Sequence, residues 1–393
     1  QQEKAVLRDF CLTSTGNQMV WGGPGIGKSA LLAQVFKEIR GGVDADGVAL
    51  QEEYPDILPY FIRRGTETSM PEKFLRHLCQ QLDVIYTLKG FGFGNSTGEL
   101  SEALELRLQH VSEQDEPKRL VLFVDGLDEA LGGNTTILRF VPTAKEWLSV
   151  LCASRQVPEV EEWYNRRDDR RSFAVTPLSV ADIRALLYEV VDKYDEGLSL
   201  AYISAVESVS QGNPLYLKLL CDQLSAGVQQ VGDIEDLPKE MEDLYKEVLF
   251  RVTDRGRNEN AHRLLLLLTE TKSSLSADMI SDVLDVSVLA ASAALDDCME
   301  LLFEDPLTTD ILDYQLFHES LREYLRKTER KSTAKMADKV TKFCLGWRDL
   351  EGHSLKYALE YTSKHLKDRE DVEGLWILLT DEEYRQTQIK VSY

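Results

Sequence analysis

The residues most able to do chemistry form a glycine-rich segment at positions 22–29. The segment reads Gly-Gly-Pro-Gly-Ile-Gly-Lys-Ser and matches the pattern GxxxxGK[ST]. Such glycines let consecutive backbone N–H groups turn toward one anion, and a helix beginning near Lys28 would add its positive dipole end. Lys28 can bridge the β- and γ-phosphates of a nucleoside triphosphate, while the Ser29 hydroxyl is a Mg²⁺ ligand. We predict nucleotide binding by Gly23, Gly25, Ile26, Gly27, Lys28, Ser29 and Ala30.

A second set of reactive side chains forms an acidic turn. Asp125 ends an apolar run at 120–124, and Asp128 and Glu129 follow at once. A carboxylate at the end of a buried strand beside a phosphate loop is placed to hold Mg²⁺, and we assign that role to Asp125. Crowded carboxylates are costly unless a cation or a reacting water shares the site. Asp128 and Glu129 are both candidates to orient the attacking water, and spacing does not choose between them.

One cation is expected near the same site. Arg155 follows the apolar run 148–153, which has a strand pattern. An arginine projecting from the carboxyl edge of a parallel sheet lies where ligands bind in open α/β folds. There it could stabilise charge on the γ-phosphate. The alternative is an ordinary surface salt bridge.

The elements that must position these residues alternate between strands and helices. Helical periodicity covers residues 28–39, 72–82 and 104–111, and apolar runs with a strand pattern lie at 17–21, 58–62, 120–124 and 148–153. Strands separated by helices imply a parallel sheet with helices on both faces. We therefore predict the α/β fold of P-loop NTPases for this part of the chain.

The second half of the chain has mainly helical patterns. Ser179 with Asp182 forms an approximate capping box for a helix at 180–191. Helices at 259–271, 277–285, 288–302 and 319–327, with short apolar runs at 301–303 and 314–317, outline a winged helix. We predict four domains: a nucleotide-binding domain at 1–176, a helical lid at 177–252, a winged helix at 253–330, and a helical stalk or the start of a C-terminal repeat region at 331–393.

Composition limits the classes of partner. The formal net charge is −22, so the surface repels phosphate backbones and we expect no direct binding of nucleic acid. No apolar run is long enough for a membrane helix. Six scattered cysteines without a CxxC pattern indicate thiols in a reducing compartment, so we expect a cytoplasmic protein.

The order of these motifs resembles that of STAND ATPases, particularly the NACHT branch. The resemblance rests on residues 22–29, Asp125-Gly126-Leu127-Asp128-Glu129, Ala153-Ser154-Arg155, Gly212-Asn213-Pro214, and the segment 59–65 with residues 74–78 behind it. The Asp-Gly-Leu-Asp-Glu form of the acidic motif is the most specific of them. The resemblance covers about residues 15–330. One departure is that the family's adenine-contacting segment before its first helix has no counterpart, because the chain begins at Gln1.

The resemblance implies roles for single residues. Lys28 and Ser29 would hold phosphate and Mg²⁺, Asp125 the Mg²⁺, and Arg155 resembles the family's sensor arginine. Pro214 resembles the proline that packs on adenine from the lid, although Gly212 and Pro214 also suit a plain helix stop and start. His318 lies where similar proteins offer a histidine to the ADP phosphate. A lone histidine at a helix start is the alternative.

The resemblance also implies a function. STAND proteins switch between a closed ADP-bound state and an oligomerising ATP-bound state, and ATP hydrolysis is slow and regulatory. We therefore expect ATP/ADP and Mg²⁺ as cofactors, homo-oligomerisation, and an unknown protein trigger sensed by a C-terminal region, in innate immunity or antiphage defence. Two alternatives are a STAND-type transcription regulator and a scaffold that binds nucleotide without hydrolysis. The predicted helix 287–302 carries no Lys or Arg, which disfavours DNA reading by that helix.

Overall fold

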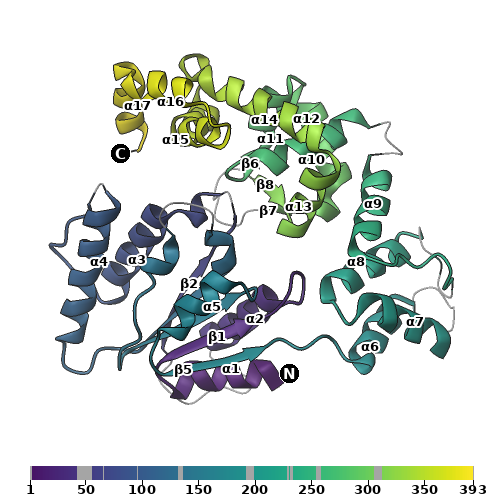
Figure 1. The fold of residues 1–393 in the computed structure, drawn as a ribbon, viewed down its shortest axis with the longest axis horizontal. Coiled ribbons are helices and arrows are strands. Elements are labelled where there is room, and N and C mark those ends of the chain that lie inside the picture. The colour runs from purple at the N-terminus through teal and green to yellow at the C-terminus, as the bar shows by residue number, and fades with distance from the viewer. Residues whose placement is uncertain are drawn as a thin grey trace. The chain divides into compact units, whose positions relative to one another are not determined.

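The structure is a computed structural model of the chain, and two compact units make it up, Gln1–Lys239 and Glu240–Tyr393 (Figure 1). The residues it describes are 2–41, 55–64, 66–94, 96–131, 136–191, 199–227, 230, 233–253, 258–304 and 312–392. The two units are coarser than our four predicted domains, which stay a prediction.

A five-stranded parallel sheet forms the centre of the first unit. Its strands are β1 (Asn17–Trp21), β2 (Asp56–Phe61), β3 (Leu120–Asp125), β4 (Leu148–Ser154) and β5 (Arg170–Ala174), in the order β2-β3-β4-β1-β5. The prediction of a parallel sheet is confirmed. We did not predict β5, because its first three residues are polar and exposed at the sheet edge, where no long apolar run is needed.

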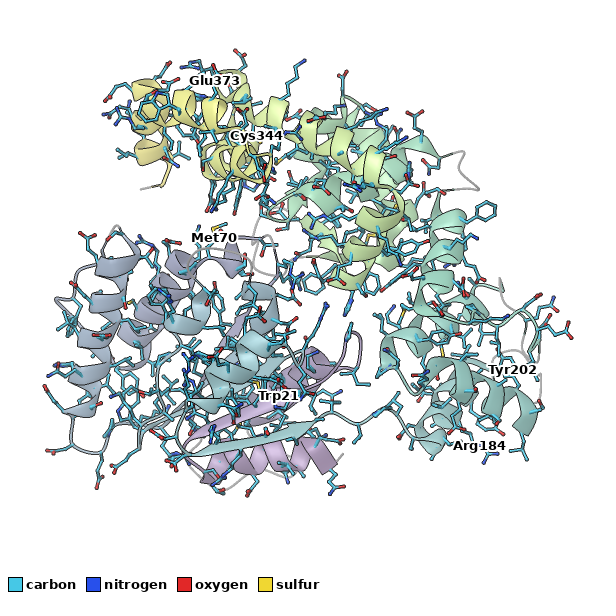
Figure 2. The ribbon with its side chains drawn as sticks, viewed as in Figure 1. Trp21, Met70, Arg184, Tyr202, Cys344 and Glu373 are labelled. Carbon is cyan, nitrogen blue, oxygen red and sulfur yellow. The ribbon has the colours of Figure 1, made fainter. Side chains whose placement is uncertain are left out.

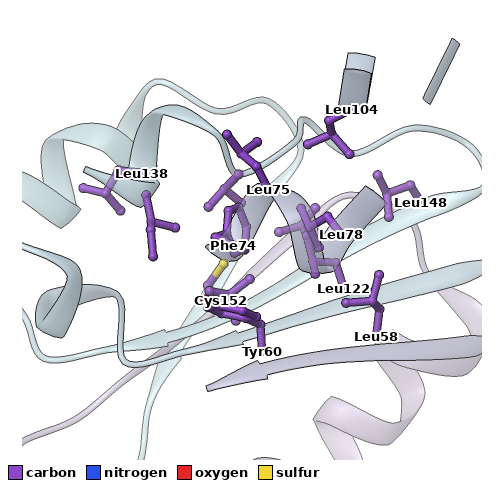
Figure 3. Close-up of a cluster of buried hydrophobic side chains, with 14 of the residues drawn as sticks. Leu58, Tyr60, Phe74, Leu75, Leu78, Leu104, Leu122, Leu138, Leu148 and Cys152 are labelled. Atoms are coloured by element: carbon purple, nitrogen blue, oxygen red, sulfur yellow. The ribbon is translucent and has the colours of Figure 1, made fainter. Parts of the chain in front are cut away.

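Helices cover both faces of this sheet. They are α1 (Gln2–Thr13), α2 (Lys28–Gly41), α3 (Pro71–Ile85), α4 (Thr97–Ser112) and α5 (Pro158–Asn165). Side chains of β3 alternate between the faces, since successive residues of a strand point in opposite directions. Leu122 joins the cluster packed under α3 and α4 (Figure 3), and Phe123 joins the cluster packed under α1 and α2.

Helix boundaries follow capping signals, some of which we missed. We predicted only residues 104–111 of α4, whereas Ser96 and Glu99 form a capping box that begins the helix at Thr97. The predicted capping box at Ser179 and Asp182 is confirmed by two reciprocal hydrogen bonds of 3.2 and 3.0 Å. It precedes α6 (Val180–Val191). The first unit also contains α7 (Leu200–Ser210) and α8 (Pro214–Ser225).

The second unit is mainly helical with a small antiparallel sheet. The helices are α9 (Met241–Val252), α10 (Glu259–Glu270), α11 (Ala277–Leu284), α12 (Val288–Cys298), α13 (Glu319–Thr328), α14 (Arg330–Leu345), α15 (Gly352–Asp368), α16 (Val372–Thr380) and α17 (Glu382–Ser392). The strands are β6 (Leu275–Ser276), β7 (Leu302–Glu304) and β8 (Asp313–Leu316), in the order β6-β8-β7.

Two expectations for this region change in detail. The predicted helix 288–302 is too long, because α12 ends at Cys298, a 3-10 turn covers Met299–Leu301, and Leu302 begins β7. We did not predict β6, which has only two residues. Residues 305–311, between the two predicted apolar runs, lie outside the described residues, as does Gly65. The winged helix therefore stays a prediction.

Three further features of the described residues concern membrane helices, cysteines and short 3-10 helices. Within the described residues, no helix combines the length and hydropathy needed to cross a bilayer. All six cysteines are free thiols, and five of them are buried. Short 3-10 helices lie at Glu67–Ser69, Leu127–Ala130, Ile137–Arg139 and Trp347–Asp349.

Candidate functional site

The glycine-rich loop connects the end of β1 to the start of α2. Figure 2 labels Trp21, the last residue of β1, where the loop begins. Gly25 and Gly27 have φ angles of 70° and 95°, a region that side chains with a Cβ rarely adopt. The first helical hydrogen bond runs from Leu31 N to Gly27 O at 2.8 Å. The loop therefore leads directly into the positive end of a helix dipole.

Lys28 is the first residue of α2 and lies over the loop. Its Nζ donates hydrogen bonds to Gly22 O at 2.9 Å and Gly23 O at 3.0 Å. Burial lowers the pKa of Lys28, while the carboxylates of Asp125 and Asp128 act in the opposite direction. The Lys28 ammonium group thus lies between loop carbonyls and nearby carboxylates.

Asp125 ends β3 and meets Ser29 of the loop. The Ser29 hydroxyl hydrogen-bonds to the Asp125 carboxylate. Burial is the main cause that raises the pKa of Asp125, against the Ser29 hydrogen bond and the charge of Lys28. The buried Oδ1 atom of Asp125 has no hydrogen-bond partner among the described residues. Such an atom is expected to have a ligand when the site is in use.

The donor set at Ser29 and Asp125 fits Mg²⁺. A hydroxyl and a carboxylate are hard oxygen donors, and Mg²⁺ in nucleotide sites takes one or two protein ligands plus phosphate oxygens and waters. Among the described residues, no group of three or more His, Cys, Asp or Glu side chains could hold a metal without such a partner. The unpartnered Oδ1 of Asp125 is the observation that supports this fit.

A glycine after Asp125 allows the acidic turn to form. Gly126 has a φ angle of 78°, and a Cβ built on it would lie 2.6 Å from the backbone oxygen of Ile62. Only glycine fits there without displacing the backbone at Ile62, the residue after β2. Gly126 N donates to Ala153 O at 3.0 Å, which fixes the turn to β4. The turn then continues as the 3-10 helix Leu127–Ala130.

The Asp128 carboxylate contacts Arg155 and the preceding residue, Ser154. Its Oδ1 accepts hydrogen bonds from Arg155 N at 2.9 Å and Ser154 Oγ at 3.2 Å. Its Oδ2 lies 3.2 Å from Arg155 Nε, and the side chains of Asp128 and Arg155 are 3% and 21% exposed. The pair joins the ends of β3 and β4, so Arg155 is not in a simple surface salt bridge.

Glu129 faces the end of β2 instead. Its Oε2 accepts a hydrogen bond from the backbone N–H of Arg64 at 3.0 Å. The Arg64 guanidinium donates to the backbone oxygen of Asp128 at 3.2 Å. Arg64 thus braces the acidic turn through two contacts. The sequence signal was its position just after β2, but only the pairing of β2 with β3 identifies its partners.

The start of α8 contacts the loop. Gln211 and Gly212 end α7 in left-handed conformations, Asn213 caps α8, and Pro214 is its first residue. The plain helix stop and start is therefore present. In addition, Asn213 Nδ2 donates to Pro24 O at 3.1 Å, and Leu215 N donates to Gly25 O at 3.2 Å.

These contacts include residues that the sequence did not indicate. Pro214 Cγ lies 3.7 Å from the Cβ position built on Gly27, so the predicted proline is next to the phosphate loop. Asn213 and Leu215 are the missed residues. Their flanking position around Pro214 was the available signal.

His318 belongs to the second unit, where it caps α13. Its Nδ1 accepts a hydrogen bond from Ser320 N at 3.1 Å, so a neutral ring carries its proton on Nε2. The Ser320 hydroxyl also lies 2.6 Å from the Tyr245 hydroxyl. A capping role at a helix start is therefore present. Our other site residues, from the loop, the acidic turn, β4 and α8, lie together in the first unit.

Comparisons with known proteins agree on the class of fold. Residues 4–151 match the family described as the AAA ATPase domain. A comparison with curated protein sequences finds no match. A solved STAND protein with a tetratricopeptide repeat sensor from Pyrococcus horikoshii is similar with a TM-score of 0.54 and 15% identity, covering 98% of this chain and 50% of that one.

Two further solved structures are less similar. They are a Walker-type ATPase of Pyrococcus abyssi (TM-score 0.41, 14% identity, 83% of this chain and 95% of that one) and the ORC2 protein of Aeropyrum pernix (TM-score 0.35, 12% identity, 86% and 94%). The chain has the fold of a P-loop NTPase. Over almost its whole length this fold is similar to that of a STAND ATPase, of which the chain spans about half the length.

Proposed function

We propose that the chain is a STAND-class signalling ATPase that binds ATP with Mg²⁺ and hydrolyses it slowly to ADP and phosphate. The observation that carries this proposal is the buried, unpartnered Oδ1 of Asp125 beside the Ser29 hydroxyl, at the base of a glycine-rich loop. A structural carboxylate buried to this degree would be expected to have its hydrogen bonds satisfied.

Each residue of the loop then has a specific task. Backbone N–H groups of residue 23 and residues 25–30 surround the phosphates, and Lys28 leaves the carbonyls of Gly22 and Gly23 to neutralise phosphate charge. Ser29 and Asp125 hold Mg²⁺, which supplies neutralisation of charge on the β- and γ-phosphates when bound. Pro214 and its neighbours close the loop from the side of α8 and offer the adenine an apolar surface.

We assign the orientation of the attacking water to Glu129 rather than Asp128. The Asp128 carboxylate is paired with Arg155, through Oδ1 to the backbone N–H and through Oδ2 to Nε, so we give it the role of holding Arg155. Glu129 lies in the same acidic turn, and its Oε2 accepts a hydrogen bond from the backbone N–H of Arg64 rather than from Arg155. Arg155 is the residue that can exchange Asp128 for a γ-phosphate, because its guanidinium lies at the carboxyl edge of the sheet.

The regulatory part of the proposal follows from linkage. A nucleotide shifts a conformational equilibrium only by its different affinity for the two states. The hydrogen bonds from α8 to Pro24 and Gly25 connect the lid to the phosphate loop, so phosphate occupancy and lid position affect one another. In this proposal ADP, with His318 on its phosphate, favours a closed state, and ATP favours an oligomerising state.

The proposed biological setting is innate immunity or antiphage defence, in the cytoplasm, with the NACHT branch as the related group. A protein trigger would act through a C-terminal sensor region. The second candidate function is a nucleotide-binding scaffold without hydrolysis, and the specific observation in its favour is that Asp128 and Glu129 both have protein partners. A DNA-reading role is disfavoured, since α12 contains no Lys or Arg.

The test compares nucleotide content and phosphate release for the purified parent and the variant Lys28→Ala. Lys37→Ala, at an exposed position of the same helix, is the matched control. We expect the parent and the control to retain nucleotide and release phosphate in a Mg²⁺-dependent way, and Lys28→Ala to do neither. Retention without phosphate release by the parent would favour the scaffold. Equal retention by Lys28→Ala would refute the site.

A further inference from the structure

Helix α4 presents an acidic face to the surface. It packs on α3 through buried residues that include Leu100, Leu104 and Val111. The opposite side carries exposed glutamates, and the only arginine of the helix adds no charge there. Arg107 is fully buried and pairs with Asp83 at 2.7 Å. The exposed glutamates of the helix and its C-cap are Glu99, Glu102, Glu105 and Glu113.

An apolar hollow of about 340 Å³ opens beside this acidic face. Leu106 and Phe93, which are 56% and 43% exposed, line it together with Phe91. Glu99 and Glu102 form part of its rim. The hollow therefore suits an apolar side chain that is accompanied by cations.

Buried Arg107 holds this hollow in shape. Its guanidinium carbon lies 5.2 and 4.9 Å from the ring centroids of Phe91 and Phe93. It also donates to the backbone oxygen of Gly92 at 3.3 Å. A hollow formed in advance costs less ordering when a partner binds.

Helix α14 of the second unit has the complementary chemistry. It carries five basic residues and one acid, Asp338, in a chain of net charge −22. Thr333, Met336 and Val340 face inward, where the helix packs against α10 and α15. Its exposed face carries, at helical spacing, Lys331, Lys335, Lys342 and Leu345, and the one acid among them, Asp338, is paired with Arg369.

The cations on this face are not engaged elsewhere in the described part of the chain. Among the described residues, Lys331, Lys335 and Lys342 make no ion pair. Leu345 is 44% exposed at the end of the same stripe. An apolar residue accompanied by lysines is what the hollow beside α4 would accept.

We propose that α14 of one copy of the chain docks on α4 of a second copy, with Leu345 in the hollow. At about 1.5 Å per residue, Glu99 to Glu113 and Lys331 to Leu345 each span about 21 Å. An antiparallel arrangement puts Leu345 at the Glu102 end and Lys335 beside Glu113.

Opposite charge is the reason that the occupant is a second copy. Two chains of net charge −22 repel one another, so association requires a local region of attraction. The acidic face and the basic face belong to different elements, so the contact is heterologous, and each added copy leaves one face of each kind for the next. The inference rests on the proposed assembly and identifies its surfaces.

The experiment reverses the charges on each face separately. The acidic-face variant is Glu102→Lys with Glu113→Lys, and the basic-face variant is Lys335→Glu with Lys342→Glu. A control with the same charge change as the acidic-face variant is Glu159→Lys with Glu235→Lys, at exposed positions away from α4. Association is measured by sedimentation velocity at low salt, with ADP and with ATP.

We expect each reversed variant alone to dissociate at least about tenfold more readily than the parent, because like charges then oppose one another. A mixture of the two variants should recover association, since lysines of one variant meet glutamates of the other in both possible pairings. The control should associate at least as well as the parent. High salt should weaken the association of the parent.

Four outcomes would overturn the inference. Association of both variants like the parent would mean that these faces are not the contact. Failure of the mixture to recover would point to a contact within one chain or to misfolding, which far-UV circular dichroism of each variant checks. An effect of the basic-face variant alone would assign the lysines to another acidic partner. A parent that never associates would refute the proposed assembly as well.

Discussion

Asp128 holds Arg155 at two points, through the backbone N–H at 2.9 Å and through Nε at 3.2 Å. The first contact fixes the end of β4, and the second determines where the guanidinium lies. An arginine that reaches toward phosphate must give up the second contact and keep the first. In the proposed function, Asp128 positions Arg155 and Glu129 orients the attacking water.

This assignment predicts different defects for the two acids. Glu129→Gln should retain ATP but lower the single-turnover rate of phosphate release about 100-fold or more, as loss of a general base does. Asp128→Ala should lower the free energy of unfolding by about 1–3 kcal/mol, because Arg155 N loses its acceptor and the Arg155 guanidinium loses its carboxylate partner. Quenched-flow measurement and urea unfolding separate the effects. Normal turnover by Glu129→Gln would contradict the assignment and make Asp128 the candidate that orients the attacking water.

Gly126 predicts a stability effect that depends on backbone geometry. Gly126→Ala combines a left-handed φ with a Cβ 2.6 Å from Ile62 O, so we expect a loss of about 2 kcal/mol or more. The matched control is Gly98→Ala in the first turn of α4, where nothing lies within 4 Å of the added Cβ. It should be neutral or slightly stabilising. Equal urea midpoints for the two variants would contradict this account.

Asn213 predicts a link between the lid and nucleotide release. Asn213→Ala removes the cap of α8 and the hydrogen bond to Pro24 O, so ADP should leave several-fold faster. Ser287→Ala removes a comparable cap from α12 in the second unit, at a similar stability cost of about 1 kcal/mol. Release of a fluorescent ADP analogue compares them. If both variants release ADP at the parental rate, the contact between lid and loop has no role in retention.

His365 predicts a pH dependence of stability in the second unit. Burial, helped by the charge of Lys272, lowers the pKa of His365 to about 3, from 6.5. Because the unfolded chain protonates first as the pH falls, stability is complete above about pH 6.5 and is lost toward pH 3. Over the whole range the loss attributable to this group is on the order of 5 kcal/mol.

The test of this pH dependence is His365→Gln, with His353→Gln at an exposed position of α15 as control. Thermal or urea unfolding between pH 7 and 4 should show a shallower decline for His365→Gln than for the parent. The control should follow the parent. Parallel curves for all three proteins would show that His365 does not titrate in the manner described.

The two main motifs of the site were predictable because each is contained in a short stretch of sequence. The glycine pattern before Lys28 and the apolar run before Asp125 each fit into one short stretch of sequence. The pairing of Asp128 with Arg155 was not predictable, because it depends on β3 lying next to β4. Likewise, Asn213 donates a hydrogen bond to Pro24 although the two residues are 189 positions apart in the sequence. No local sequence pattern specifies such a contact.

The edge strand β5 was not predictable for another reason, which is that its hydropathy does not resemble that of a strand. Its residues 170–172 are exposed and include Arg170 and Arg171, so nothing in their hydropathy indicates a strand. It pairs in register with β1, Asn17 opposite Arg170, and Phe173 is the side chain of the strand that packs against the core. A strand of this kind is found only when its partner is known.

The end of β4 has a consequence for how much this site can vary. The oxygen of Ser154 accepts from Gly22 N at 3.2 Å, and that of Ala153 accepts from Gly126 N at 3.0 Å. Two neighbouring carbonyl groups of β4 thus fix the positions of both the phosphate loop and the acidic turn. Insertions in the connections between strands should then be tolerated without loss of chemistry, whereas a shift of β4 by one residue would disable both halves together.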